Sequence, residues 1–276
     1  MTAARRAELG EFLRAHRAAT QPADVGLPAG AHRRTPGLRR EELAMLAGVS
    51  VTWYTWLEQG RPINASRDVL DALARTLRLD PAEHDHLLAL AAPAAPADAH
   101  DAPDDAPDAL VRLIAAMEPA PAYVLGPRWE YLAWNRAQSR LYPTIDRLPP
   151  ERCNLLWVVF AEPDARALIV EWEEQARRIM AEFRAGTATL RTDPRVADLV
   201  GRLTAASPEF AAWWPQQDVA QFQTRLRRYR HPRAGELVFE YQQLTPSEWP
   251  GLRVVCQLPV PDDDSAARLS AWHTVA

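Results

Sequence analysis

Apolar residues recur at helical spacing through the first 92 residues of the chain. Leu9, Phe12 and Leu13 form the first such stripe, and no segment here alternates between apolar and polar positions as a half-buried strand does. The segment 20–37 is rich in proline and glycine and is predicted to be a loop. The pattern therefore predicts five short helices, one before this loop and the others over 39–47, 50–59, 67–77 and from Asp80 onward.

The second part of the chain has a mixed pattern. Short β-prone runs at 122–125 and 129–134 flank a glycine-proline turn, which predicts a hairpin. The other predicted elements are helices over 164–185 and 193–205 and strands over 237–244 and 252–260. Because strands at both ends enclose helices, this part is predicted to form one α+β domain.

Between the two parts, residues 93–108 contain four prolines and five aspartates and almost no bulky side chains. A segment of this composition cannot bury enough surface to offset its ordering entropy, which favours a linker. An irregular loop inside a single domain is the alternative. The predicted organisation is an all-helical domain over 1–92, the linker over 93–108 and the α+β domain over 109–276.

Charge and cysteine content narrow the class of protein. Arginine supplies all 32 basic residues against 36 acidic ones, so any case for a nucleic-acid partner must rest on a local surface. The apolar runs are far shorter than a membrane span, and the first residues do not resemble a secretory signal. Two distant cysteines, Cys153 and Cys256, exclude a disulfide scaffold. We therefore expect a cytoplasmic protein with no membrane partner.

The segment 43–57 has the turn chemistry of two crossing helices. Gly48 can take the left-handed conformation that ends the first helix, and Ser50 can cap the second. Tyr54 and Leu57 then face inward on the second helix. The outward residues are Val51, Thr52, Thr55 and Trp56. This arrangement predicts a helix-turn-helix, whose second helix enters the major groove of DNA. The alternative is a helical hairpin that only packs.

The side chains around this motif can contact DNA in two ways. Arginine makes bidentate contacts with phosphate, whereas hydroxyl groups make single contacts. The second helix has no Arg, Asn or Gln in its first turn, so Thr52 and Thr55 are expected to contact thymine methyl groups or single acceptors. One such site binds modestly, which favours a homodimer on a repeated half-site. The candidate DNA-binding residues are Arg33, Arg34, Arg39, Arg40, Ser50, Val51, Thr52, Thr55, Trp56 and Arg61.

The motif resembles the lambda-repressor-like, Xre-type helix-turn-helix family in the order of its "EELA", "AGVS" and "LEQGR" segments. The longer stretch "RRTPGLRREELAMLAGVSVTWYTWLEQGR" resembles the MmyB-like transcription regulators of actinobacteria, and "PAYVLGPRWEYLAWNRA", "SPEFAAWW" and "RHPRAGELVFEYQQL" follow in the same order. The resemblance implies that Arg40 and Arg61 approach the DNA backbone and that Glu58 is structural. It also implies that Val51, Thr52, Thr55 and Trp56 face base edges. Trp56 stands where the family usually has a basic residue.

The resemblance further implies a PAS-like C-terminal domain that binds a small apolar ligand such as a fatty acid. Eight of the ten tryptophans follow the linker, and aromatic side chains can line such a cavity. The candidate pocket residues are Trp129, Trp134, Trp157, Phe160, Trp213, Trp214, Phe239 and Tyr241. Any single one of them is better explained as a core residue, but the eight together favour a pocket.

An arginine cluster precedes the strand predicted over 237–244, and one of its members could pair with a ligand carboxylate. A solvated strand face or turn is the alternative for each. The cluster consists of Arg225, Arg227, Arg228, Arg230 and Arg233.

The sequence favours no catalytic function. It contains no glycine-rich phosphate loop, no nucleophile elbow and no cysteine pair at metal-ligand spacing. We therefore expect no catalytic residues, no metal and no cofactor. The hypothesis is a transcription regulator that binds double-stranded DNA and senses a small ligand. The alternative is a C-terminal domain that serves only as a dimerisation or protein-partner module.

Overall fold

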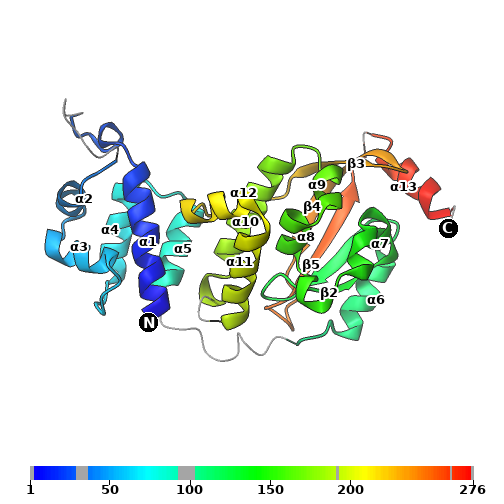
Figure 1. Cartoon of the computed structure of the whole chain (residues 1–276), viewed down its shortest axis with the longest axis horizontal. Coiled ribbons are helices and arrows are strands. Elements are labelled where there is room, and N and C mark those ends of the chain that lie inside the picture. The colour runs from blue at the N-terminus through cyan, green and yellow to red at the C-terminus, as the bar shows by residue number, and fades with distance from the viewer. Residues whose placement is uncertain (1–2, 29–36, 93–102, 191–192, 262, 275–276) are drawn as a thin grey trace. The chain divides into compact units, whose positions relative to one another are not determined.

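The computed structural model describes residues 3–28, 37–92, 103–190, 193–261 and 263–274 (Figure 1). Contacts divide the chain into two compact units, each of which is described by itself. The first comprises Met1–Ala95, Arg184–Asp198 and Ala212–Gln221, and the second comprises Pro96–Phe183, Leu199–Ala211 and Phe222–Ala276. Most of the linker predicted over 93–108 lies outside the described residues. None of the described helices is long and apolar enough to span a bilayer.

The N-terminal part of the first unit contains the five predicted helices. They are α1 (Ala3–Ala19), α2 (Arg40–Ala47), α3 (Val51–Glu58), α4 (Arg67–Leu77) and α5 (Pro81–Ala91). The side chain of Asp80 caps α5 by accepting a hydrogen bond from the Glu83 amide at 2.8 Å, and Glu83 returns one to the Asp80 amide at 2.8 Å. The predicted loop between α1 and α2 includes a short 3₁₀ turn, Pro22–Val25.

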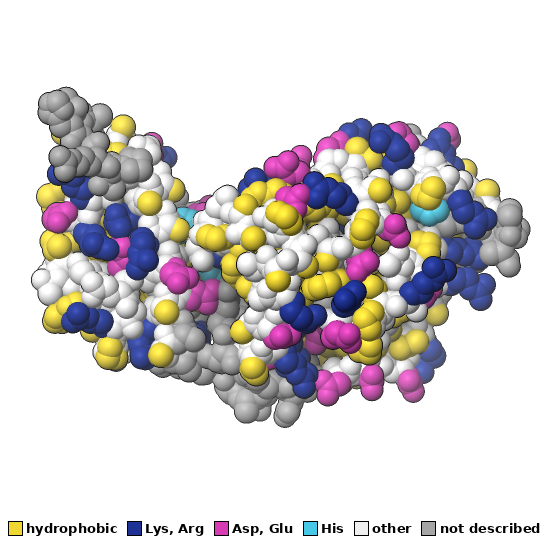
Figure 2. All heavy atoms as spheres, in the orientation of Figure 1, with side chains coloured by type: hydrophobic (Ala, Val, Ile, Leu, Met, Phe, Trp, Pro, Cys, Tyr) yellow, Lys and Arg dark blue, Asp and Glu magenta, His cyan; other side chains and the backbone are white. Residues whose placement is uncertain are grey.

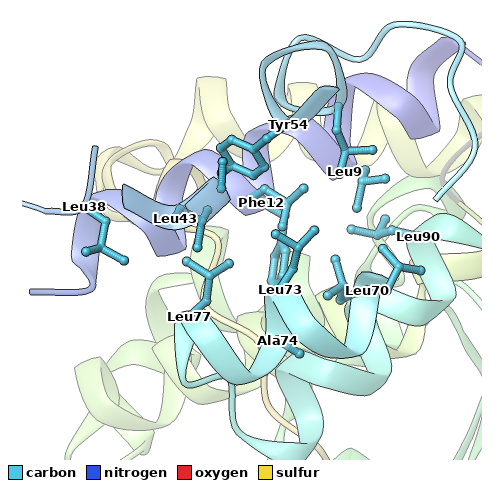
Figure 3. Packing of buried hydrophobic residues seen from close by; sticks show 14 of the residues in the cluster. Leu9, Phe12, Leu38, Leu43, Tyr54, Leu70, Leu73, Ala74, Leu77 and Leu90 are labelled. Atoms are coloured by element: carbon cyan, nitrogen blue, oxygen red, sulfur yellow. The ribbon is translucent and has the colours of Figure 1, made fainter. Parts of the chain in front are cut away.

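One apolar core holds these helices together (Figure 3). Figure 3 shows side chains from α1, α2, α3, α4 and α5 converging on it. Phe12 and Tyr54 are fully buried there. Gly10 lets α1 approach α3 closely, because a Cβ atom at this position would lie 2.3 Å from the Glu58 carbonyl oxygen. The close crossing leaves little freedom in how α3 is presented.

The second unit contains a five-stranded antiparallel sheet in the order β2-β1-β5-β4-β3. The strands are β1 (Ala122–Leu125), β2 (Tyr131–Trp134), β3 (Leu226–His231), β4 (Gly235–Leu244) and β5 (Arg253–Pro259). The remaining helices of the chain are α6 (Asp108–Ala116), α7 (Arg136–Leu141), α8 (Leu155–Ala161), α9 (Pro163–Leu168), α10 (Trp172–Gly186), α11 (Pro194–Ala206), α12 (Pro208–Trp213) and α13 (Ser265–Thr274). An all-helical part followed by an α+β part confirms the predicted fold class.

The two faces of the sheet differ in chemistry. On one face, Leu110 and Ile114 of α6 pack against Val124 and Val254 in an aliphatic core. Paired residues in an antiparallel ladder point to the same side of the sheet. The pairs Arg227↔Phe239 and Tyr241↔Gln257 therefore place these four side chains on the other face. That second face is aromatic and polar.

Three predicted elements differ from the structure. The single helix predicted over 164–185 is wrong, because it is divided into α9 and α10. Ile169 forms a β-bridge with Tyr229, and Glu171 has a positive φ of 52°, so the chain leaves the helical path there. The strand predicted over 129–134 begins only at Tyr131, because Trp129 has a positive φ of 66° in the preceding turn. The arginine cluster does not simply precede a strand, because most of it forms β3.

Candidate functional site

The connection between α2 and α3 has the predicted turn chemistry. Gly48 ends α2 with φ 70° and ψ 30°, in the left-handed region. The Val49 amide donates to the Ala44 carbonyl at 2.9 Å, which closes the turn. The Ser50 hydroxyl then caps α3 by accepting a hydrogen bond from the Trp53 amide at 3.1 Å. Ser50 thus has a structural task whether or not it also contacts DNA.

Helix α3 has one buried and one exposed side. Tyr54 and Leu57 are buried, as predicted, whereas Val51 and Trp56 are each 39% exposed. Thr52 is exposed as well, and Thr55 is half-buried. The Thr55 hydroxyl donates to the Val51 carbonyl at 2.8 Å. Thr55 can therefore offer an outside partner only its methyl group and the acceptor capacity of its oxygen.

Arginine surrounds this exposed side. The Arg61 guanidinium lies 5.6 Å from the centre of the Trp56 ring, at a distance typical of a cation–π contact. The side chain of Arg39 is exposed at the start of α2. Figure 2 shows arginine side chains interspersed with acidic ones on the visible face of these helices. Arg33 and Arg34, which were also predicted to contact DNA, lie outside the described residues.

A buried carboxylate ties the first three helices together. Glu58 has a side chain that is 0% exposed, and it accepts hydrogen bonds from three arginines. Arg17 of α1 donates to it at 2.8 and 3.2 Å, Arg40 of α2 at 3.1 and 3.2 Å, and Arg14 of α1 at 3.3 Å. We call these four residues the Glu58 hub. The structure thus gives Glu58 the structural position that the family resemblance implied.

The hub keeps Glu58 ionised. Burial raises the pKa of this carboxyl, but hydrogen bonds from Arg17 and Arg40 outweigh burial, and the pKa is lowered overall. Burial lowers the pKa of Arg17, but the hydrogen bond to Glu58 outweighs it, and the pKa is raised overall. Arg40, predicted to lie near a phosphate, already uses part of its guanidinium on Glu58, while its side chain is 41% exposed.

The predicted pocket aromatics occupy different surroundings. Phe239 and Tyr241 project from β4 into the aromatic face of the sheet, where both are buried. The indole nitrogens of Trp134 and Trp157 donate to Asp146 and Glu162, at 2.8 and 2.9 Å. Trp134 also packs edge-on against Tyr131, with ring centres 6.2 Å apart, so it adjoins the tyrosines, whereas Trp157 is buried.

The other four candidates are dispersed. Phe160 packs edge-on against Phe210, with ring centres 5.1 Å apart. Trp129 is buried against Phe183, and its indole nitrogen has no hydrogen-bond partner among the described residues. Trp213 and Trp214 belong to the first compact unit, whereas β4 belongs to the second.

Tyrosines, rather than tryptophans, dominate the aromatic face. The chain has six tyrosines, and five of them follow the linker. Tyr229 and Tyr241 share a hydrogen bond of 2.6 Å between their hydroxyl groups. The rings of Tyr123 and Tyr131 are 5.0 Å apart, and Tyr142 packs edge-on against Tyr229. Sequence reasoning missed four of these five. Of these four, Tyr123 and Tyr131 could have been found from their positions in the predicted hairpin.

The members of the arginine cluster have unequal surroundings. Arg225 pairs with Glu182, Arg228 with Glu171, and the exposed Arg230 with Glu236 at 3.5 Å. Arg227 differs from them, because it is only 4% exposed and its guanidinium lies 3.7 Å from the centre of the Tyr241 ring. Strand alternation places it on the aromatic face.

Comparison with known families matches both parts of the chain. Residues 8–87 match a helix-turn-helix domain, and residues 106–271 match the MmyB-like transcription regulator ligand binding domain. The chain belongs to the MmyB-like transcription regulators. None of the curated proteins matches it.

The family assigns a task to each part of this MmyB-like regulator. The helix-turn-helix match spans most of α1 to α5, including the exposed side of α3, which makes the protein a DNA-binding transcription regulator. The ligand-binding match contains the whole sheet and hence the aromatic face. Among the described residues, no group of histidines, cysteines and acidic residues is arranged to hold a metal ion.

Proposed function

We propose that this MmyB-like regulator binds operator DNA as a homodimer through α3 and responds to a small apolar, fatty-acid-like ligand in its C-terminal domain. The functional domains are 1–92 and 109–276, with residues 93–108 as their linker, and the protein acts in the cytoplasm without catalysis. The observation that carries the proposal is the exposed side of α3, which the packed helical core holds next to the arginines Arg39, Arg40 and Arg61. The aromatic face of the sheet supports the ligand-binding half.

The DNA contacts divide into two kinds. Val51, Thr52, Thr55 and Trp56 supply the contacts to base edges, where methyl groups and an aromatic edge suit thymine-rich positions. The arginines and Ser50 supply contacts to phosphate, which position the protein without reading sequence. Arg61, stacked on Trp56, places a cation at the edge of the reading surface.

The proposed ligand binding is supported by the composition of the aromatic face of the sheet. Large aromatic side chains bring apolar area with little conformational entropy, which suits an apolar ligand. The five-stranded antiparallel sheet, with helices packed against it, supports a PAS-like domain. A ligand changes operator binding only if it binds the two arrangements of the dimer with different affinities.

The DNA-binding half is tested by fluorescence anisotropy with labelled promoter fragments from the protein's own gene neighbourhood. Trp56→Ala should weaken operator binding about tenfold, the loss expected for one base contact of about 1–3 kcal/mol. Met45→Ala is the matched control, because Met45 is an exposed apolar residue of the preceding helix, outside the predicted contacts. Equal loss in both variants, or no loss in either, would contradict the assignment.

The sensing half is tested by adding dodecanoate to the same operator complex of the full chain. We expect operator affinity to change by at least about fivefold, the lower range of allosteric coupling. An unchanged affinity at saturating dodecanoate would refute sensing of a fatty-acid-like ligand.

A second candidate for the C-terminal domain is a dimerisation or partner module. Leu226 and Leu258 are 54% and 42% exposed, and both pair in register with Glu240, so they share the face of the sheet that also carries the aliphatic core. Native mass spectrometry separates the two functions. Co-purified lipid supports the sensor, whereas a ligand-free dimer that Leu226→Ser converts to a monomer supports the module.

A further inference from the structure

Strand β3 breaks the usual rule for which residues a sheet buries. Leu226 is 54% exposed, whereas the next residue, Arg227, is 4% exposed. A register shifted by one residue would bury the leucine and expose the arginine. The ladder nevertheless holds Arg227 opposite Phe239 along a continuous pairing with β4. Departures of this kind from local preference concentrate at functional sites.

The guanidinium of Arg227 lacks the partners that a buried cation requires. It lies over the ring of Tyr241, and its Nε atom has no hydrogen-bond partner among the described residues. No carboxylate in the described part of the chain forms an ion pair with it. The nearby carboxylate of Glu182 instead binds Arg225 and Arg178.

A buried charge is normally paired and hydrogen-bonded, because removing it from water is costly. The π face of a tyrosine recovers only part of that cost. Arg184, another buried arginine, shows the usual solution, since it donates to the Gln217 side chain and to the Trp214 carbonyl. Arg227 therefore presents unused capacity for an anion.

We propose that Arg227 binds the carboxylate of an organic acid whose apolar body packs against the tyrosines of the aromatic face. This inference rests on the proposed function, because it takes the C-terminal domain to be the ligand-binding domain. The guanidinium fork matches a carboxylate in two parallel hydrogen bonds. The guanidinium lies over the ring of Tyr241, whose hydroxyl is linked to that of Tyr229, so this hydroxyl pair is on the same face of the sheet and can supply a further donor.

The proposal makes the charge of the ligand a condition for binding. An acid and the alcohol of the same chain length bury the same apolar surface, but only the acid neutralises Arg227. Both an aliphatic and an aromatic acid satisfy this chemistry, so the length and shape of the body are set by the surrounding rings. The experiment must therefore vary head group and body separately.

The test is isothermal titration calorimetry of the full chain with dodecanoate, dodecanol and naphthoate. We expect at least one of the two acids to bind. If dodecanoate binds, dodecanol should bind at least about tenfold more weakly. Arg227→Met should remove that acid preference. Arg230→Met, on the exposed side of the same strand, should keep it.

Arg227→Lys guards against loss of the fold, because it keeps the charge and loses the fork; its acid affinity should fall between wild type and Arg227→Met. Dodecanol binding as tightly as dodecanoate, or an acid preference that survives Arg227→Met, would overturn the assignment while leaving ligand sensing intact. Binding of neither acid overturns it as well. Acid binding that depends on Arg227 but leaves operator affinity unchanged upholds it and refutes the proposed response to ligand.

Discussion

The Glu58 hub makes the first three helices depend on one carboxylate. In Glu58→Gln the shape is kept, but the negative charge shared by Arg14, Arg17 and Arg40 is lost. Breaking a buried ion pair by neutralising one partner costs about 3–5 kcal/mol. Arg14 and Arg40 are half-exposed and can be solvated, and Arg17 keeps its hydrogen bond to the Leu38 carbonyl at 2.8 Å. The lower end, about 3 kcal/mol, is therefore expected.

Hydrogen-exchange mass spectrometry of the full chain measures this loss where it occurs. A loss of about 3 kcal/mol in local opening corresponds to exchange about 150-fold faster in peptides from α1, α2 and α3. Peptides from the sheet of the second unit should be unaffected. Glu11→Gln, on the exposed side of α1, is the matched control and should change little.

The pH dependence has a definite sign. Because the folded pKa of Glu58 is depressed, its contribution to stability is present above its unfolded pKa and is lost as pH falls through the folded value. The difference between wild type and Glu58→Gln should therefore shrink on acidification below the ordinary glutamate range. Equal protection in Glu58→Gln and Glu11→Gln at neutral pH would refute the reasoning.

Three further predictions concern glycines and thiols. Gly10→Ala should destabilise α1–α3 by about 2 kcal/mol or more in urea unfolding, because its methyl group would meet a carbonyl oxygen. Gly201→Ala, in the middle of a helix with open space around it, should instead stabilise the protein by about 1 kcal/mol. The opposite order would contradict the close crossing of α1 and α3. Gly48→Ala also has open space, so in the same urea unfolding it should cost only the left-handed backbone strain of about 1–2 kcal/mol, and a larger loss would indicate an unseen contact. Burial raises the pKa of the half-buried Cys153 thiol to about 11 and raises that of the buried Cys256 thiol. Both should therefore react with Ellman's reagent much more slowly in the folded protein at pH 8 than in guanidinium chloride, and equal rates in the two conditions would contradict this prediction.

The helix-turn-helix was predictable because its determinants are local. Gly48 and Ser50 set where one helix ends and the next begins, and the helical period then fixes which side of α3 holds Tyr54 and Leu57. The Glu58 hub was less accessible. Its arginine partners on α1 lie more than forty positions away in the chain, and pairing at that separation leaves no periodic signal.

The C-terminal part was harder to predict because tertiary contacts override local pattern there. Strand β3 carries arginines on both sides, so it has no hydrophobic alternation that would mark it as a strand. The break between α9 and α10 contains no glycine or proline and depends on the bridge from Ile169 to Tyr229. For the same reason, sequence reasoning could name Arg227 only as one of five arginines.

The geometry of Arg40 has a consequence for how a phosphate would be met. Its Nε and Nη2 atoms are bonded to Glu58, and a guanidinium has five N–H donors in all, so donors remain on the outer, 41% exposed part of the side chain. A phosphate arriving there would find the side chain already oriented, with most of its rotamer entropy lost during folding rather than on binding. The Glu58 carboxylate bonded to Arg40 would also partly neutralise the guanidinium charge. A phosphate contact at Arg40 would therefore contribute more to orientation than to electrostatic attraction.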